Sequence, residues 1–100
     1  MIRLLLLFIL ISSISFSQVP NYVPSSGLVG WWPFNGNAND ESVNTNNGTV
    51  NGATLTTDRF GNGNSAYDFD GIDDYIEINH SSNLNLNTLT ISAWINVRVF

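Results

Sequence analysis

The sequence predicts an all-β fold of two antiparallel sheets, arranged as a sandwich or jelly roll, and three observations support this prediction. Short apolar stretches are separated by Asn-Gly turn signals that begin at residues 35, 47, 51 and 62. No stretch after residue 17 keeps the 3.6-residue period of an amphipathic helix. Leu89–Phe100 alternates apolar and polar side chains, as a half-buried strand does. Several short strands at such close spacing are typical of sandwiches and jelly rolls.

The N-terminus has the parts of a secretory signal peptide. Arg3 supplies a positive charge, Leu4–Ile11 is an unbroken apolar run, and Ser15-Phe16-Ser17 fits a small-x-small cleavage site. The apolar run is shorter than the roughly 20 residues that a membrane-spanning helix needs. We therefore expect residues 1–17 to be removed on export and the protein to be secreted or held at the cell surface, without stable membrane insertion. An uncleaved membrane anchor is the alternative.

The remaining chain, Gln18–Phe100, is acidic and has no cysteine. It keeps two arginines against eight acidic residues, which is a net charge of −6. Nucleic acids and anionic membrane surfaces are bound through basic patches, so this charge argues against both as partners. Carboxylates in such excess are suited to holding a cation. Without disulfides, we expect stability to come from packing, from a bound metal or from residues beyond Phe100.

The first half of this chain contains two strand candidates. Gln18–Ser26 includes two prolines and is expected to be a leader or linker. Leu28–Phe34 is the first candidate strand, at a sheet edge or bulge because Pro33 has no N–H to donate. Asn35–Gly48 is a long polar loop, and loops of this length are usually functional or disordered. Thr49–Thr56 is expected to be a strand interrupted by an Asn-Gly turn.

The second half contains three more candidate strands. Asp58–Ser65 is a loop whose glycines favour positive φ. Ala66–Phe69 and Tyr75–Ile78 are short strands on either side of Asp70–Asp74, which we expect to be a hairpin turn because Asp-Gly favours tight turns. Leu89–Phe100 is the strongest strand of the chain. Because the sequence stops within this strand, we expect residues 27–100 to be part of a larger domain.

Four blocks of sequence follow one another in a characteristic order: Gly27–Asp40, Asn46–Ala53, Arg59–Ile76 and Leu89–Ile95. The most specific part is the run Ala-Tyr-Asp-Phe-Asp-Gly-Ile-Asp-Asp-Tyr-Ile, at the end of the third block. Together the blocks resemble the first part of bacterial laminin-G-like domains, which have the concanavalin A-like lectin and glucanase fold. The resemblance implies a jelly-roll sandwich of two antiparallel sheets, to which residues 27–100 contribute the N-terminal part.

The long polar loop is a candidate calcium site. Ca²⁺ binds several oxygens from carboxylates, side-chain amides and backbone carbonyls, and Asn39 and Asp40 offer such oxygens. The resemblance implies a structural Ca²⁺ beside residues 39–48, with Asp40 as the matching ligand. The chain departs from the family at Ser42-Val43-Asn44, where the family commonly has Ser-Gly-Asn. The alternative is that these residues only form Asx turns.

Asp70 is a second candidate calcium ligand. Asp73 and Asp74 follow it closely in the sequence. Neighbouring residues of a strand point to opposite faces of the sheet, so Asp73 and Asp74 are a poor chelating pair unless a bulge turns them together. The alternative is that Asp70 and its neighbouring glycine simply form a turn.

Trp94, Trp31 and Tyr75 are candidate sugar-binding residues. Aromatic faces stack on the C–H surfaces of sugars, while Asn and Asp side chains hold the hydroxyl groups. Trp94 is the leading candidate, because it lies on the side of its strand opposite the aliphatic stripe. For each of these residues, burial in a sandwich core is the alternative.

A non-catalytic role is favoured. Glycoside hydrolysis needs two carboxylates that flank the bond, and Tyr75–Asn79 offers Glu77 alone. His80 has no second histidine or cysteine beside it. We therefore expect a secreted binding module, accessory to a larger protein, whose partner is a glycan or a cell-surface protein. The alternatives are a fragment of a secreted glycoside hydrolase with catalytic residues beyond residue 100, and a structural adhesin spacer.

Overall fold

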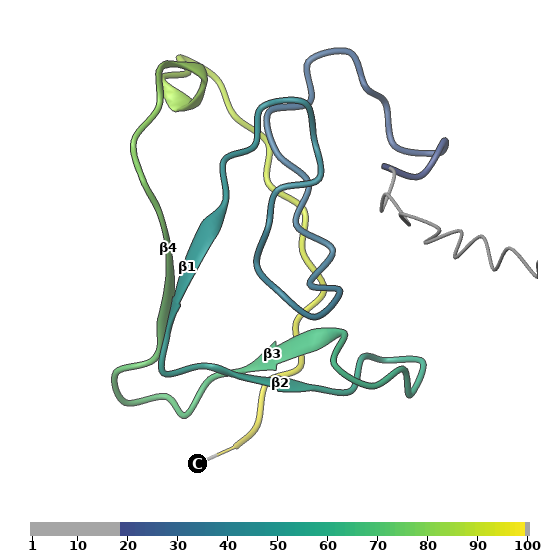
Figure 1. Ribbon diagram of the computed structural model, residues 1–100, viewed down its shortest axis with the longest axis vertical. Coiled ribbons are helices and arrows are strands. Elements are labelled where there is room, and N and C mark those ends of the chain that lie inside the picture. The colour runs from purple at the N-terminus through teal and green to yellow at the C-terminus, as the bar shows by residue number, and fades with distance from the viewer. Residues whose placement is uncertain (1–18, 100) are drawn as a thin grey trace, which may run out of the picture.

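The computed structural model describes residues 19–99, which form an all-β structure with almost no helix (Figure 1). The strands are β1 (Gly48–Asn51), β2 (Thr54–Thr56), β3 (Ala66–Asp68) and β4 (Tyr75–Ile78). A single 3₁₀ turn, η1 (Ser82–Leu84), follows β4 within the described part of the chain. The all-β prediction is therefore confirmed at the level of fold class. The expected signal peptide, residues 1–17, lies outside the described residues.

The four strands form two small antiparallel sheets. β1 pairs with β4, with Asn51 opposite Tyr75, and β2 pairs with β3, with Thr54 opposite Asp68. Two residues separate β1 from β2, whereas six separate β3 from β4. The two ladders thus belong to one long hairpin, whose end loop is residues 57–65. The returning side of the hairpin, from β3 to β4, has four more residues between its two strands than the side from β1 to β2. Where these residues are inserted the hairpin bends, so that β2 and β3 lie across the end of β1 and β4 (Figure 1).

Residues 70–74, where the sequence predicts a hairpin turn, do not form one in the structure. β3 and β4, on either side of it, pair with β2 and β1 and not with each other. The segment 69–74 is therefore a large bulge on the returning side of the hairpin, and the hairpin prediction is wrong. The Asp-Gly signal correctly marked a break in the strand, but strand pairing, which depends on the whole chain, determined what kind of break it is.

Gly52 makes the bend possible on the opposite side of the hairpin. Its φ is +85°, a region that residues with a side chain adopt at a cost. A Cβ at this position would lie 2.1 Å from Oδ1 of Asp74. The Asn51-Gly52 signal therefore matches a position where both the backbone conformation and the nearby Asp74 carboxylate disfavour a side chain.

We expect Gly52→Ala to cost more stability than Gly61→Ala. Gly61 also has positive φ, at +82°, but nothing lies within 4 Å of the Cβ that it would gain. The Gly61 variant should therefore lose only the conformational term of about 1 kcal/mol. The Gly52 variant should lose about 1 kcal/mol more, because the Asp74 carboxylate must move and give up a backbone hydrogen bond. Equal urea midpoints for the two variants would contradict this.

Residues 28–34 are not a strand, which corrects the sequence prediction. Several of their backbone groups pair with the polar loop, through its side chains and through the N–H of Glu41, rather than with a neighbouring strand. The carbonyl oxygen of Val29 accepts from Asn44 Nδ2 at 2.9 Å, and the N–H of Trp31 donates to Asp40 Oδ1 at 2.9 Å. The segment therefore satisfies its hydrogen bonds without entering a sheet.

The prediction of a strand over residues 89–100 is also wrong for the part that the structure describes. Residues 89–99 form no backbone hydrogen bonds with other described residues. Their aliphatic side chains face solvent, with Ile91 80% and Ile95 81% exposed. An alternating pattern predicts a strand only where a partner strand is present, and no described segment provides one.

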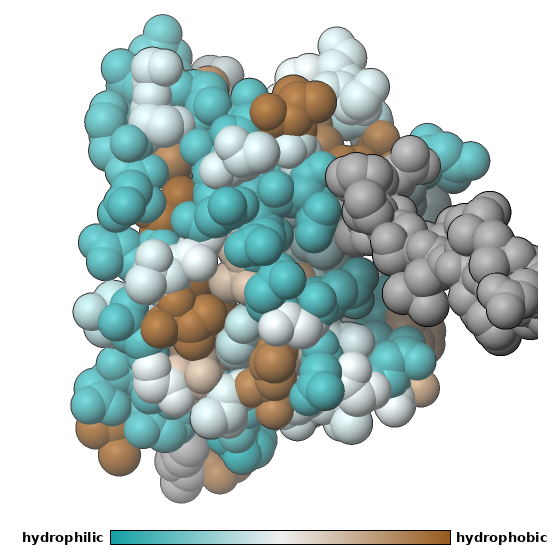
Figure 2. All heavy atoms as spheres, viewed as in Figure 1, coloured by the Kyte–Doolittle hydropathy of each residue, from teal (hydrophilic) through white to brown (hydrophobic). Residues whose placement is uncertain are grey.

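The buried centre of the described chain is polar. Ala38 is the buried apolar residue, and the buried polar residues beside it are Asp40, Ser42 and Asn46. Apolar side chains instead reach the surface in patches between hydrophilic ones (Figure 2). The described residues include no helix that is both long and apolar enough to cross a membrane.

Candidate functional site

Asp40 organises the long polar loop through its carboxylate. Oδ1 accepts from the N–H of Trp31 at 2.9 Å and from the N–H of Ser42 at 2.8 Å, and Oδ2 accepts from the N–H of Asn46 at 2.8 Å. These donors are spread over residues 31–46, and Asp40 itself is only 4% exposed. One buried side chain therefore ties the two sides of the loop together.

Asparagine side chains extend this network. The N–H of Asp40 donates to Asn47 Oδ1 at 3.0 Å. Asn46 Nδ2 donates to Asn83 Oδ1 at 2.9 Å, and Trp32 Nε1 donates to the carbonyl oxygen of Asn46 at 2.9 Å. The loop is thus ordered by its own side chains. Asn39, by contrast, is exposed, and its N–H donates to Asn37 Oδ1 at 2.9 Å in an Asx turn.

The carboxylate of Asp40 has little capacity left for a metal. A carboxylate has about four lone-pair sites, and three backbone N–H groups already occupy Oδ1 and Oδ2. Burial raises the pKa of Asp40, but the hydrogen bonds from Trp31, Ser42 and Asn46 lower it, and the net pKa lies below its ordinary value. Hydrogen bonds from the backbone therefore favour the charged form of this carboxylate.

We expect the stability of the fold to fall at acid pH, and Asp40 to carry part of that loss. Because its pKa is lowered in the folded state from the ordinary value of 3.8, its contribution is fully present above that value and is lost as pH falls through the folded pKa. Urea midpoints measured from about pH 5 to about pH 2 should fall less steeply for Asp40→Asn than for the native protein. Parallel slopes would assign the acid sensitivity to other groups.

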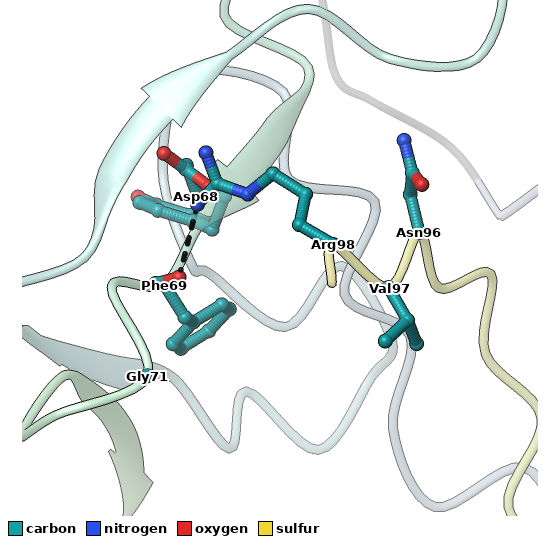
Figure 3. A pocket seen from close by; sticks show the side chains of 7 residues that line it. Asp68, Phe69, Gly71, Asn96, Val97 and Arg98 are labelled. Atoms are coloured by element: carbon teal, nitrogen blue, oxygen red, sulfur yellow. Dashed lines mark hydrogen bonds and ion pairs between the residues drawn. The ribbon is translucent and has the colours of Figure 1, made fainter. Parts of the chain in front are cut away.

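A pocket of about 250 Å³ lies between β3 and residues 96–98 (Figure 3). Arg98 spans it, with Nη2 donating to Asp68 Oδ1 at 2.6 Å and to the carbonyl oxygen of Phe69 at 3.3 Å. Both charged side chains are about half exposed, so this pair adds little stability. It attaches the C-terminal segment to β3 and uses the polar groups that a ligand in this pocket would need.

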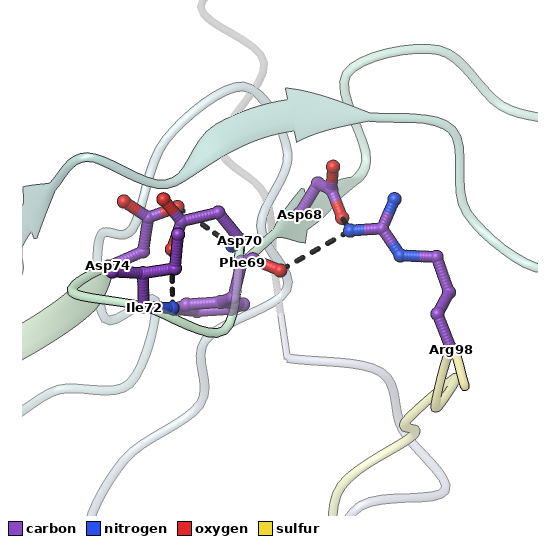
Figure 4. Close-up of polar contacts among 6 residues, drawn as sticks. All are labelled: Asp68, Phe69, Asp70, Ile72, Asp74 and Arg98. Atoms are coloured by element: carbon purple, nitrogen blue, oxygen red, sulfur yellow. Dashed lines mark hydrogen bonds and ion pairs between the residues drawn. The ribbon is translucent and has the colours of Figure 1, made fainter. Parts of the chain in front are cut away.

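The 69–74 bulge gathers three carboxylates. Asp70 Oδ1 accepts from the N–H groups of Ile72 and Asp73, at 2.9 and 3.3 Å, and Asp74 Oδ2 accepts from the N–H of Asp70 at 2.9 Å (Figure 4). Carboxylate oxygens of Asp70, Asp73 and Asp74 lie within 4.8 Å of one another. The sequence predicts that Asp73 and Asp74 are a poor chelating pair unless a bulge turns them together, and in the structure both belong to such a bulge.

Backbone N–H groups stabilise the negative charge of the Asp70 carboxylate in this bulge. The hydrogen bond from the N–H of Ile72 is the main cause that lowers the pKa of Asp70, and the N–H of Asp73 lowers it further. Among the described residues, the ion pair formed is Arg98 with Asp68, so no basic side chain pairs with the three carboxylates. The bulge fits a hard cation better than the Asp40 loop does, although three carboxylates supply only part of the six to eight oxygens that Ca²⁺ takes.

A third cluster, which we call the aromatic–guanidinium cluster, consists of Arg59, Phe60 and Trp94. The guanidinium carbon of Arg59 lies 3.8 Å from the centroid of the Trp94 ring and 4.3 Å from that of Phe60. Trp94 is 81% exposed and Phe60 is 72% exposed. The cluster therefore combines two solvent-facing rings with one positive charge.

The other candidate aromatic residues lie in different surroundings. Trp31 is half-buried against the polar loop, and its backbone N–H donates to Asp40 Oδ1. Tyr75 is in β4 and is 52% exposed. Among the described residues, the one ring pair in contact is Phe34 with Tyr67, edge to face at 5.0 Å. The structure thus does not stack the three predicted aromatic residues on one another.

Sequence reasoning did not select Arg59 as a site residue. Its position beside Trp94 joins segments far apart in the chain, and neither segment carries a local signal for the contact. A lone arginine in a loop of an acidic chain was the available hint.

Comparison with protein-family models, curated proteins and solved structures finds no match to this chain. The laminin-G-like resemblance therefore stays a prediction.

Proposed function

We propose that this protein is a secreted, non-catalytic module that binds glycans at the cell surface. In this proposal, residues 27–100 contribute the N-terminal part of a laminin-G-like jelly roll. The observation that supports it is the exposure of Trp94, whose side chain is 81% accessible to solvent. A large aromatic ring in water loses apolar hydration when a sugar covers it, so an exposed indole favours stacking on a pyranose.

The surroundings of Trp94 suit this role. Arg59 contacts the ring from one face, and a sugar would stack on the other. Tyr75 is the second candidate contact because it is half exposed and lies in a regular strand, where its position is well defined. Trp31 contributes less directly, since its half-buried position serves the polar loop.

Calcium belongs to the proposal as a structural cofactor. The bulge formed by Asp70, Asp73 and Asp74 is the favoured location, because its carboxylate oxygens lie together, with Asp70 and Asp73 exposed and Asp74 partly buried. Asp40 and Asn39 are less suited, since the carboxylate of Asp40 already accepts three backbone hydrogen bonds. A cation at the bulge would neutralise its repulsion and hold β3 and β4 in position.

The proposal predicts that Trp94→Ala weakens glycan binding about tenfold or more, which corresponds to about 1.4 kcal/mol of lost stacking. The measurement is a glycan array, followed by affinity electrophoresis of the full chain in gels containing the polysaccharides that give a signal. Tyr22→Ala is the matched control, because Tyr22 is an equally exposed aromatic residue, at 78%, in the leader segment.

Three results would contradict the proposal. Unchanged binding by the Trp94 variant would remove this residue from the site. Absence of binding to any glycan would favour the structural spacer. Release of reducing sugar from a bound polysaccharide would favour the hydrolase.

A further inference from the structure

Arg59 is the charged member of the aromatic–guanidinium cluster, and its surroundings differ from those of Arg98. Arg98 pairs with Asp68 and with a backbone carbonyl. Arg59, although exposed, donates no hydrogen bond to another described residue and forms no ion pair with one. Its protein contacts are the faces of Phe60 and Trp94. The guanidinium is therefore positioned by its flat faces, while its N–H groups have no acceptor among residues 19–99.

The nearest carboxylate in the sequence is already occupied. Asp58 Oδ1 accepts from the N–H groups of Phe60 and Asn62, both at 2.9 Å, and Asp58 Oδ2 accepts from Asn62 Nδ2 at 3.0 Å. Through these bonds the Asp58 carboxylate is directed toward residues 60–62 of its own loop. The charge of Arg59 helps to lower the pKa of Asp58, but the two side chains form no ion pair, so the N–H groups of Arg59 remain available to a ligand.

A guanidinium positioned in this way favours a carboxylate as its ligand. Its planar fork of N–H donors matches the two oxygens of a carboxylate, and contact with aromatic rings limits the rotamers that it must give up on binding. The neighbouring rings favour a ligand with an apolar C–H face. A hexuronic acid has both features, since its pyranose ring carries C–H faces and its C5 substituent is a carboxylate.

We propose that the aromatic–guanidinium cluster is a subsite for uronic acid units of an acidic glycan. Arg59 receives the carboxylate of one unit through its N–H edge, and the face of Trp94 opposite Arg59 receives the ring of a neighbouring unit. This inference rests on the proposed glycan-binding function and narrows it to a ligand class.

The test uses one polymer in two charge states. Polygalacturonate and its fully methyl-esterified form share the same backbone, but only the first has free carboxylates. We expect the full chain to bind polygalacturonate at least about tenfold more tightly than the ester, since a charge-assisted bidentate contact contributes about 1.5–3 kcal/mol. Arg59→Gln should remove this preference. Arg59→Lys should retain only part of it, because an ammonium has no planar fork.

Arg98→Gln is the matched control, since it removes the same charge from a guanidinium that is already paired. It should keep the preference for polygalacturonate, whereas Trp94→Ala should weaken binding to both polymers. Circular dichroism verifies that each variant is folded.

The outcomes separate the two proposals. Equal binding of the two polymers, or a preference that survives Arg59→Gln or disappears equally in Arg98→Gln, would overturn the uronate subsite and leave glycan binding standing. Binding to neutral polysaccharides alone would do the same. Failure to bind either polymer or any neutral glycan would overturn both proposals.

Discussion

Asp40→Ala should destabilise the fold by about 3 kcal/mol or more. The substitution leaves the N–H groups of Trp31, Ser42 and Asn46 without their acceptor at a site where the side chain is 4% exposed. Each buried donor that loses its partner costs about 1–3 kcal/mol. Chemical unfolding followed by tryptophan fluorescence measures the change, since Trp31 is one of the residues whose N–H loses its acceptor.

Asp58→Ala is the control for Asp40→Ala. Asp58 also accepts three hydrogen bonds, from Phe60 and twice from Asn62, but in an exposed loop. Water can replace those bonds, so this variant should lose about 1 kcal/mol or less. If the two variants lost the same stability, burial would not be what makes Asp40 important.

The second large effect concerns residues 89–99, through which we expect the protein to self-associate in solution. Their backbone donors and acceptors have no partners among the described residues. The aliphatic stripe of this segment is exposed, with Val97 at 77% and Val99 at 99%. An extended, exposed and apolar segment of this kind is a template for strand pairing with another chain. Sedimentation at increasing concentration should therefore show assemblies larger than the monomer.

Ile91→Lys combined with Ile95→Lys should suppress this association, because charges on the stripe oppose close pairing of chains. The matched control is Val43→Lys combined with Ile72→Lys, which introduces the same charge at two apolar residues that are 95% and 87% exposed elsewhere. The control should associate as the native protein does. A native protein that remains monomeric at all concentrations would refute the expectation.

Residues 89–99 have the alternating pattern of a strand, but the side of the segment that contacts the rest of the described chain is not the one that the pattern predicted. Its alternation predicted that the aliphatic side would face a core and that Trp94 would lie on the opposite side. Trp94 and Arg98, both on that opposite side, make the contacts to the rest of the described chain. The aliphatic side is left in solvent, and Trp94 on the opposite side is itself 81% exposed although Arg59 contacts it. Sequence alternation separates the two faces of a strand, but the neighbours available determine which face is covered.

The sequence alone was sufficient for the fold class and for where β1 to β4 lie, although two other candidate strands, at residues 28–34 and 89–100, are not strands among the described residues. β1 to β4 all fall at the predicted positions, and Gly52 and Gly61 have the positive φ expected of their turns. These features depend on side-chain type, alternation and backbone freedom within a few residues, so they can be recognised locally.

The tertiary structure decided which groups pair across long distances. It made residues 28–34 a partner of the polar loop rather than a strand, converted the expected hairpin turn into a bulge that gathers three carboxylates, and placed Arg59 against Trp94. It also made Asp40 an acceptor for three backbone donors. The physical reason is that each polar group bonds to whichever partner the path of the whole chain brings within about 3 Å, and local sequence carries no record of that path.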